Sequence, residues 1–255
     1  VKSYTTSFVA VGNYQVALGD VNGRIAVWDL RKGEREAVLE TKSPICSFAL
    51  AKEVNLLASS CFDGSIRIYE IPSMKLKCVL QSSFASPGEL SFSDNGKVLL
   101  STFGSSGEIQ MWDLNNKEIK HAIKAHSGTV SAIALSSQGD LCASGDYDGN
   151  IKIWQIDNLK LLHNVPSTHW QIRDLIFSQD GRFFAYGTEE RTEVRSLQML
   201  TVLDLTIKGS MLAFSGNGDR LIVAPGVGSK SGTDVLIYSL DLGAAERKTN
   251  NLFEK

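Results

Sequence analysis

The stretch from His126 to Ile156, HSGTVSAIALSSQGDLCASGDYDGNIKIWQI, decides the fold of this chain. Its pattern predicts an alternating strand over 130–135, a polar turn, a second strand over 141–145, a turn at 147–150 and a third strand ending at Trp154. The rest of the sequence consists of closer or more distant copies of this stretch.

One third-strand position shows the repeat most clearly. The residue equivalent to Trp154 recurs at intervals of 41, 43, 42, 41 and 43 residues. The six equivalent residues are Trp28, Tyr69, Trp112, Trp154, Arg195 and Tyr238. Such a period is typical of a β-propeller, because one twisted four-stranded sheet must stack on its neighbours to bury both faces. The sequence therefore predicts an all-β propeller of six four-stranded antiparallel blades.

The predicted blades cover the whole length, so we expect residues 1–255 to form one propeller domain. Their bounds are about 4–40, 44–81, 87–124, 127–166, 171–205 and 207–255. The last blade has a longer second hairpin loop, Ala224–Asp234, with three glycines and Lys230. A phosphate-binding loop needs GxxxxGK[ST] before a helix, so we interpret this segment as a hairpin tip, with an anion site as the alternative.

Composition excludes several classes of protein. The net charge is −2, with 43% hydrophobic and 21% charged residues, which favours neither disorder nor a basic nucleic-acid binder. No run approaches 18 apolar residues, and the four cysteines form no CxxC pair. We expect reduced, buried cysteines, no cofactor or metal, no membrane partner, and a cytoplasmic protein, with the nucleus as the alternative. Because the chain begins with Val1, we interpret it as a fragment, a processed chain or an excised domain.

The sequence resembles the WD-repeat (WD40) family of β-propellers over essentially its full length. The most specific residues are the Trp-Asp pairs at Trp28 and Trp112, the related Trp154-Gln155, and Ala125-His126 where the family often has Gly-His. The resemblance implies a structural tetrad of hydrogen-bonded side chains, formed by His126, Ser144, Asp148 and Trp154. In that arrangement the carboxylate fixes the imidazole, the imidazole reaches the hydroxyl, and the hydroxyl accepts the indole N–H.

A Ser/His/Asp set also suggests a hydrolase. A catalytic serine needs exposure beside a base and an oxyanion hole, often on a GxSxG elbow, whereas Ser144 is expected in the middle of a strand. We therefore predict no catalytic residues and favour the structural role.

The other blades depart from the tetrad. Blade two keeps Ser59 and Asp63 but has Tyr69 and no histidine, and blade three is expected to use Thr102 with Trp112. Blade five has Glu189 and Arg195 at two of the positions, which suggests a replacement ion pair.

Large residues in loops are the candidates for partner binding. Trp170 is the one tryptophan outside a third strand, in the link that enters blade five. In WD-repeat proteins that link and the second hairpin turn share the usual partner face. Phe62, Tyr147 and Phe103 occupy or border second turns, so we expect them to line that face with Trp170. The alternative is that Trp170 packs down on Ile172.

The expected function is a non-catalytic scaffold or adaptor that binds protein or peptide partners, within a larger chain or complex. The alternatives are an enzyme with a ligand site in the central channel and a sensor domain that regulates an attached effector. The sequence does not decide how the ring closes, because family members commonly have seven blades. Three arrangements are consistent with it: six blades that close by themselves, six blades in a ring that a partner or a missing segment completes, and six blades of a larger propeller.

Overall fold

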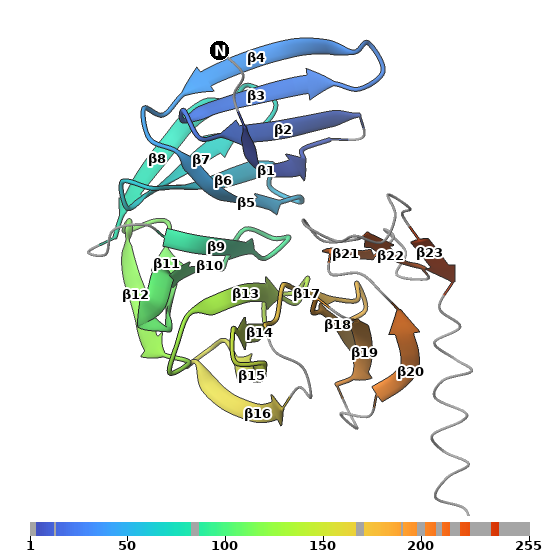
Figure 1. Ribbon diagram of the computed structural model, residues 1–255. Helices are drawn as coiled ribbons and strands as arrows, with labels where there is room; N and C mark the ends of the chain where they lie inside the picture. Colours follow the sequence, from blue (N-terminus) through green and yellow to red (C-terminus); the bar gives the residue numbers. More distant parts are fainter. Residues whose placement is uncertain are drawn as a thin grey trace, which may run out of the picture.

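The computed structural model describes residues 4–12, 14–82, 87–166, 171–189, 191–197, 202–207, 211–214, 220–224 and 236–239. These residues contain 23 β-strands and one short 3₁₀ turn, η1 at Gly104–Ser106 (Figure 1). The strands form six antiparallel sheets, each ordered as in the chain, and we refer to them as blades one to six. None of the helical segments described is both long and apolar enough to cross a membrane.

The strands of the first three blades are β1 (Thr5–Ala10), β2 (Gln15–Asp20), β3 (Arg24–Asp29), β4 (Glu34–Glu40), β5 (Ile45–Ala51), β6 (Leu56–Cys61), β7 (Ser65–Glu70), β8 (Lys75–Gln81), β9 (Pro87–Phe92), β10 (Leu99–Phe103), β11 (Glu108–Asp113) and β12 (Glu118–Lys124). The strands of the last three are β13 (Val130–Leu135), β14 (Leu141–Asp146), β15 (Asn150–Gln155), β16 (Lys160–Pro166), β17 (Asp174–Phe177), β18 (Phe183–Gly187), β19 (Thr192–Ser196), β20 (Val202–Ile207), β21 (Met211–Phe214), β22 (Arg220–Ala224) and β23 (Leu236–Ser239).

The propeller prediction is confirmed. Blades one to five have four strands, and blade six has three described strands, β21 to β23. The repeated Trp154 position lies in the third strand of every blade, as the spacing requires. The predicted fourth strand of blade six and most of the loop Ala224–Asp234 lie outside the described residues.

Alternating side chains hold neighbouring blades together. In blade one, Ala17, Ile25 and Val27 are buried against Ile45 and Leu57 of blade two. Equivalent clusters join blade two to three, three to four, four to five and five to six. Because successive strand residues face opposite sides, each central sheet buries apolar side chains on both faces.

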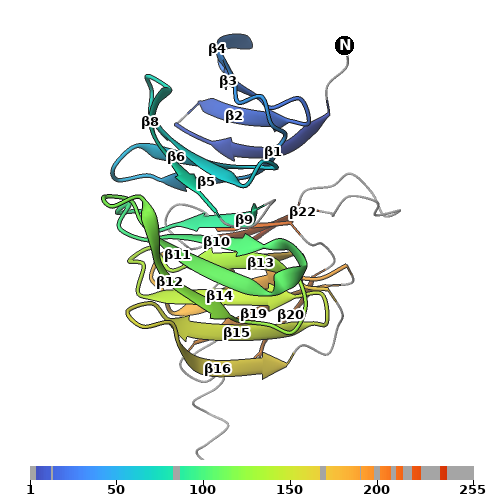
Figure 2. The same ribbon diagram turned by 90° about the vertical axis from the view of Figure 1, so that its left-hand side faces the viewer.

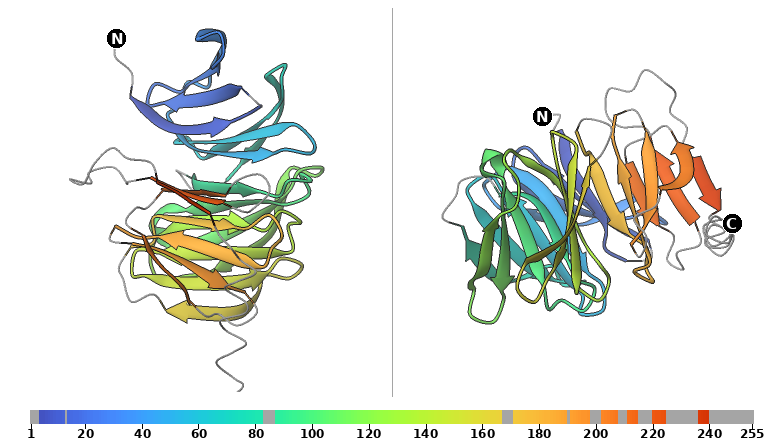
Figure 3. Two further views of the ribbon diagram at one scale, coloured as in Figure 1. Left: turned by 90° about the vertical axis from the view of Figure 1, so that its right-hand side faces the viewer. Right: turned by 90° about the horizontal axis from the view of Figure 1, so that it is seen from below.

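The first strand of each blade lies on the inside of an arc. These strands pack in chain order: β1 on β5, β5 on β9, β9 on β13, β13 on β17 and β17 on β21. Figures 1 and 3 show that this arc does not close between the described strands of blade one and blade six. Figure 2 shows blades one and two stacked above the others.

Among the described strands, only blade two packs on blade one, so the other face of blade one has no described sheet against it. Phe8 pairs with Leu18 across β1 and β2, and Leu18 pairs with Ala26 on β3, so the three share the face away from blade two. Phe8 is 60% exposed although it lies within a strand. Blade six has a matching outer face, where Ile222 pairs with the 61% exposed Ile237. Such faces are usually covered by another sheet.

Candidate interaction face

Three second hairpin turns have the same construction. Each joins the second and third strands of a blade and is closed by a glycine N–H that donates to the carbonyl three residues earlier. The donor and acceptor pairs are Gly23 to Asp20 (3.1 Å), Gly64 to Cys61 (3.0 Å) and Gly149 to Asp146 (3.3 Å). All three glycines have positive φ, which suits glycine because it has no Cβ.

The residue after each turn's first position is an exposed apolar side chain. Val21 is 41% exposed, Phe62 61% and Tyr147 47%. Because the blades repeat, these three side chains occupy the same end of the propeller, and we name this surface the turn face. Exposed aromatic side chains at equivalent positions are typical of a protein interface. Phe62 and Tyr147 are thus placed where the sequence predicted them.

A buried hydrogen-bonded chain supports the blade-four turn. Trp154 Nε1 donates to Ser144 Oγ (2.8 Å), and His126 Nε2 lies 2.7 Å from the same hydroxyl. His126 Nδ1 lies 2.9 Å from Asp146 Oδ2. An ionised carboxylate only accepts, so Nδ1 carries the proton and Nε2 accepts from Ser144.

The protonation states follow from burial and hydrogen bonding. Burial lowers the pKa of His126 more than the neighbouring Asp146 raises it, so the imidazole is neutral. Burial raises the pKa of Asp146, but hydrogen bonds from Asn150 and His126 outweigh it, and the pKa is lowered overall. Asp146 is therefore the one charged side chain among these four hydrogen-bonded residues.

The structure corrects the expected carboxylate. Asp148 is exposed and does not contact His126; its backbone N–H donates to Asp146 Oδ1 (3.0 Å). Asp146 is the last residue of β14 and pairs with Val130 at the start of β13, which places it beneath the link that carries His126. The tetrad geometry joins His126, Ser144 and Trp154 to Asp146 in place of Asp148.

The same geometry argues against the hydrolase alternative for this set of residues. Ser144 is fully buried, and its hydroxyl lies between Trp154 and His126. A substrate has no access to this hydroxyl in the folded blade, so the set lacks an available nucleophile.

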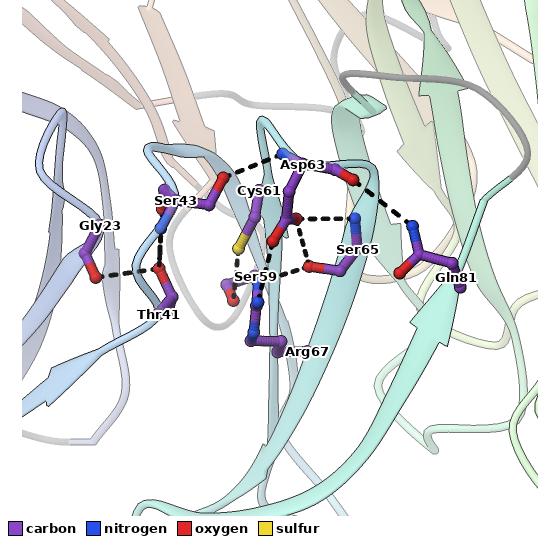
Figure 4. Close-up of polar contacts among 9 residues, drawn as sticks. All are labelled: Gly23, Thr41, Ser43, Ser59, Cys61, Asp63, Ser65, Arg67 and Gln81. Atoms are coloured by element: carbon purple, nitrogen blue, oxygen red, sulfur yellow. Dashed lines mark hydrogen bonds and ion pairs between the residues drawn. The ribbon is translucent and has the colours of Figure 1, made fainter.

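Blade two holds its turn with a different network (Figure 4). Asp63 accepts from Ser65 Oγ and forms an ion pair of 3.0 Å with Arg67, while its backbone N–H donates to Ser43. Cys61 takes the place that Asp146 has in blade four, and its Sγ lies 4.0 Å from Ser59 Oγ. The network fixes the backbone on both sides of Phe62.

Blade three requires two corrections. Trp112 Nε1 donates to Ser101 Oγ (2.8 Å), and Thr102 instead accepts from the backbone N–H of Glu89. Phe103 was expected on the partner face but is only 2% exposed and packs in the cluster with Leu99 and Trp112. The chain reverses one residue later, in η1, so Phe103 remains a core strand residue.

Blade five also differs from the expected ion pair. Arg195 pairs with Glu193 (3.1 Å) and donates to Tyr186, whereas Glu189 pairs with Arg173. Burial and the hydrogen bond to Glu193 raise the pKa of Tyr186 to about 12, so the phenol keeps its proton. This network occupies the place of the His/Ser/Trp chain of blade four.

Some sequence predictions cannot be placed. Trp170 lies outside the described residues, as does most of the long loop of blade six. Within the described part of the chain, His, Cys, Asp and Glu side chains do not gather in threes at a place that could hold a metal ion. All four cysteines are unpaired thiols.

Comparison with known proteins identifies the family. The model of the family described as PROPPIN matches residues 5–218. The chain belongs to this family. The WD-repeat resemblance is also confirmed: human WD repeat domain phosphoinositide-interacting protein 1 is 29% identical over 184 residues, covering 69% of this chain and 41% of that protein.

Other similar proteins support the same fold. Rice small ribosomal subunit protein RACK1y is 26% identical over 106 residues, covering 42% of this chain and 31% of that protein. A chain in a crystal structure of the mitotic checkpoint complex superposes with a TM-score of 0.79 at 18% identity, covering 93% of this chain and 75% of that one. This PROPPIN-family chain spans less than half the length of the human and rice relatives.

Proposed function

We propose that this protein is a non-catalytic scaffold that binds protein or peptide partners on the turn face, within a larger chain or complex. The main support for this proposal is the pair of exposed aromatic side chains, Phe62 and Tyr147. They lie at equivalent turn positions, above rigid polar networks. Rigid aromatic anchors bring large contact area at low entropic cost. Trp170 stays a third candidate anchor from the sequence. The rice relative is named as a small ribosomal subunit protein, which supports a scaffold within a complex. We place this scaffold in the cytoplasm, with the nucleus as the alternative.

Substitution at the two anchors tests the proposal. Partners are first identified by placing a photo-crosslinking amino acid at position 62 or 147 of the intact protein. Capture of the same partner is then compared between wild type, the double variant Phe62→Ala/Tyr147→Ala, and the control Leu30→Ala. Leu30 is 66% exposed and lies between β3 and β4, at the opposite ends of the strands.

We expect the double variant to lose the partner by at least tenfold while its free energy of unfolding changes by less than about 0.5 kcal/mol per site. Leu30→Ala should keep full capture. Equal loss in the control, or retained capture in the double variant, would contradict a partner site on the turn face.

A phosphoinositide is the second candidate ligand, because the human relative carries phosphoinositide interaction in its name. The four described arginines of blade five weigh against it, because each lies within ion-pair distance of a carboxylate: Arg173, Arg182, Arg191 and Arg195. Sedimentation with vesicles that contain or lack phosphoinositides separates the two: binding only to phosphoinositide vesicles would favour this ligand over a protein partner.

We further infer that a partner or a segment outside residues 1–255 completes the ring. The outer faces of blades one and six support this, because Phe8 and Ile237 are each about three-fifths exposed at 60% and 61%. A sheet inserted between them would bury both faces, as the neighbouring blades do for each other.

A further inference from the structure

The blade-four turn presents an aromatic ring and a carboxylate side by side in sequence. Tyr147 is 47% exposed and Asp148 is exposed beside it. Asp146 Oδ1 accepts the backbone N–H groups of Asp148 (3.0 Å) and Asn150 (2.8 Å), so the turn backbone is fixed. The tip is therefore preorganised, which lowers the entropic cost of binding.

Open space lies beside the Asp148 carboxylate. Among the described residues, a Cβ added at Gly128, in the link that enters blade four, would meet only Asp148 Oδ2 within 4 Å, at 3.9 Å, apart from its chain neighbours. The carboxylate makes no hydrogen bond or ion pair with another side chain among the described residues. It is thus available to a ligand that approaches over the turn and the link.

The described charged residues of blade four at this tip leave an excess of one negative charge. Asp146 and Asp148 contribute two negative charges, and the neutral His126 contributes none. Lys152 contributes one positive charge, but its Nζ donates to the Ala125 carbonyl and lies 5.7 Å from the Trp154 ring. On blade five, Arg173 and Glu189 cancel each other.

Blade two provides an internal comparison. Its turn has the same shape and presents Phe62 and Asp63, but Asp63 is neutralised by Arg67 at 3.0 Å. Cys61 stands where blade four has the charged Asp146. Two turns of equal construction therefore differ in charge: the blade-two tip suits an apolar group, and the blade-four tip suits a cation.

We propose that the partner bound on the turn face carries an arginine or lysine side chain that lies against the Tyr147 ring and pairs with the Asp148 carboxylate. This inference rests on the proposed scaffold function and adds the chemistry of its ligand. An aromatic face attracts a cation through its ring quadrupole, and an exposed carboxylate adds a charge-assisted hydrogen bond. Together these contacts correspond to a factor of about 5 to 30 in affinity.

Selection from a random peptide library tests the inference and does not require the partner to be identified. Phage-displayed dodecapeptides are panned on the intact wild-type protein, on Asp148→Lys and on the matched control Glu53→Lys. Glu53 is exposed in the turn between β5 and β6, on the opposite side of the propeller. Neither substitution removes a buried side chain, so both variants should fold.

We expect wild type and Glu53→Lys to enrich peptides with arginine or lysine at a fixed position, and Asp148→Lys to lose that enrichment. Replacing the selected arginine by citrulline, or a selected lysine by its acetylated form, should raise the Kd about 5- to 30-fold on wild type and less than about 2-fold on Asp148→Asn. Tyr147→Leu, which keeps apolar area but removes the ring, should weaken the basic peptide several-fold.

Three outcomes of the peptide experiments would overturn the inference. The first is no peptide enrichment, and the second is enrichment without a basic residue. The third is a rise in Kd, on replacing the basic residue by citrulline or acetyl-lysine, that is as large on Asp148→Asn as on wild type. Peptides that depend on Phe62 and Tyr147 but lack a basic residue would leave the scaffold function standing and remove only the cation. Loss of peptide binding in Glu53→Lys would also contradict the assigned site.

Discussion

His126 Nδ1 lies 2.9 Å from Asp146 Oδ2, and both side chains are shielded from solvent. Replacing Asp146 by Asn removes the charge and forces the imidazole into a poorer hydrogen bond, so we expect Asp146→Asn to lower the free energy of unfolding by about 2–3 kcal/mol. Asp148→Asn should change it by less than about 0.5 kcal/mol. Urea unfolding of the two variants checks this, and equal losses would contradict the assignment of Asp146.

The indole of Trp154 is a second anchor of the same blade. It is 6% exposed and donates to Ser144 at 2.8 Å. We expect Trp154→Ala to cost about 3–5 kcal/mol, because it leaves a cavity and removes the N–H group that donates to the Ser144 hydroxyl. Trp154→Phe should cost less, since it keeps most of the apolar area. A loss below about 1 kcal/mol for the alanine variant, measured by thermal and urea unfolding, would show that Trp154 is not a core anchor.

The repeat was readable from the sequence because propeller blades impose a period. Intervals of 41 to 43 residues between equivalent third-strand residues located the blades, and the polar turns located most strand ends. These signals depend only on chain length and turn chemistry. These signals do not show which of two nearby polar residues forms a hydrogen bond with a given side chain of the same blade.

The incorrect serine or threonine assignment in blade three is an error of register. A shift of one residue moves a strand side chain to the opposite face, so Ser101 rather than Thr102 shares a face with Trp112. Glu193 and Arg195 are two residues apart in β19 and lie on one face, a period that was visible in the sequence. The second strand's last residue, rather than the turn, supplies the carboxylate for His126.

The pH dependence of stability should reveal Asp174. Burial raises its pKa to about 7, the N–H groups of Leu212 and Leu175 oppose this, and the negative charge of Glu89 adds to it. The folded state therefore holds a proton that the unfolded state releases near pH 4, so this group's stabilising contribution is present below pH 4 and is lost as the pH rises towards 7. The Asp174 carboxylate accepts from Leu212 of blade six at 2.7 Å.

We expect Asp174→Asn, which stays neutral, to be more stable relative to wild type at pH 8 than at pH 4. The measurement is urea unfolding of both proteins across this range, with the difference between them isolating Asp174 from other titrating groups. A constant difference would mean that Asp174 has no raised pKa in the folded protein.

The uncovered face of blade one gives the last prediction. Phe8 is 60% exposed on that face, so removing it takes little burial from the isolated chain. We expect Phe8→Ser to change the free energy of unfolding by less than about 0.5 kcal/mol, whereas Leu57→Ala, in the fully buried core between blades one and two, should cost about 2–5 kcal/mol.

The same substitution should act strongly wherever the ring is completed. A covering sheet would bury the ring of Phe8, so Phe8→Ser should weaken association with that sheet by about 1.5–3 kcal/mol, read by sedimentation with the completing partner or segment. Leu30→Ser, on an equally exposed turn residue, controls for surface hydrophobicity. A large stability loss for Phe8→Ser in the isolated chain would instead mean that the chain itself already covers this face, and the arc would need no further sheet.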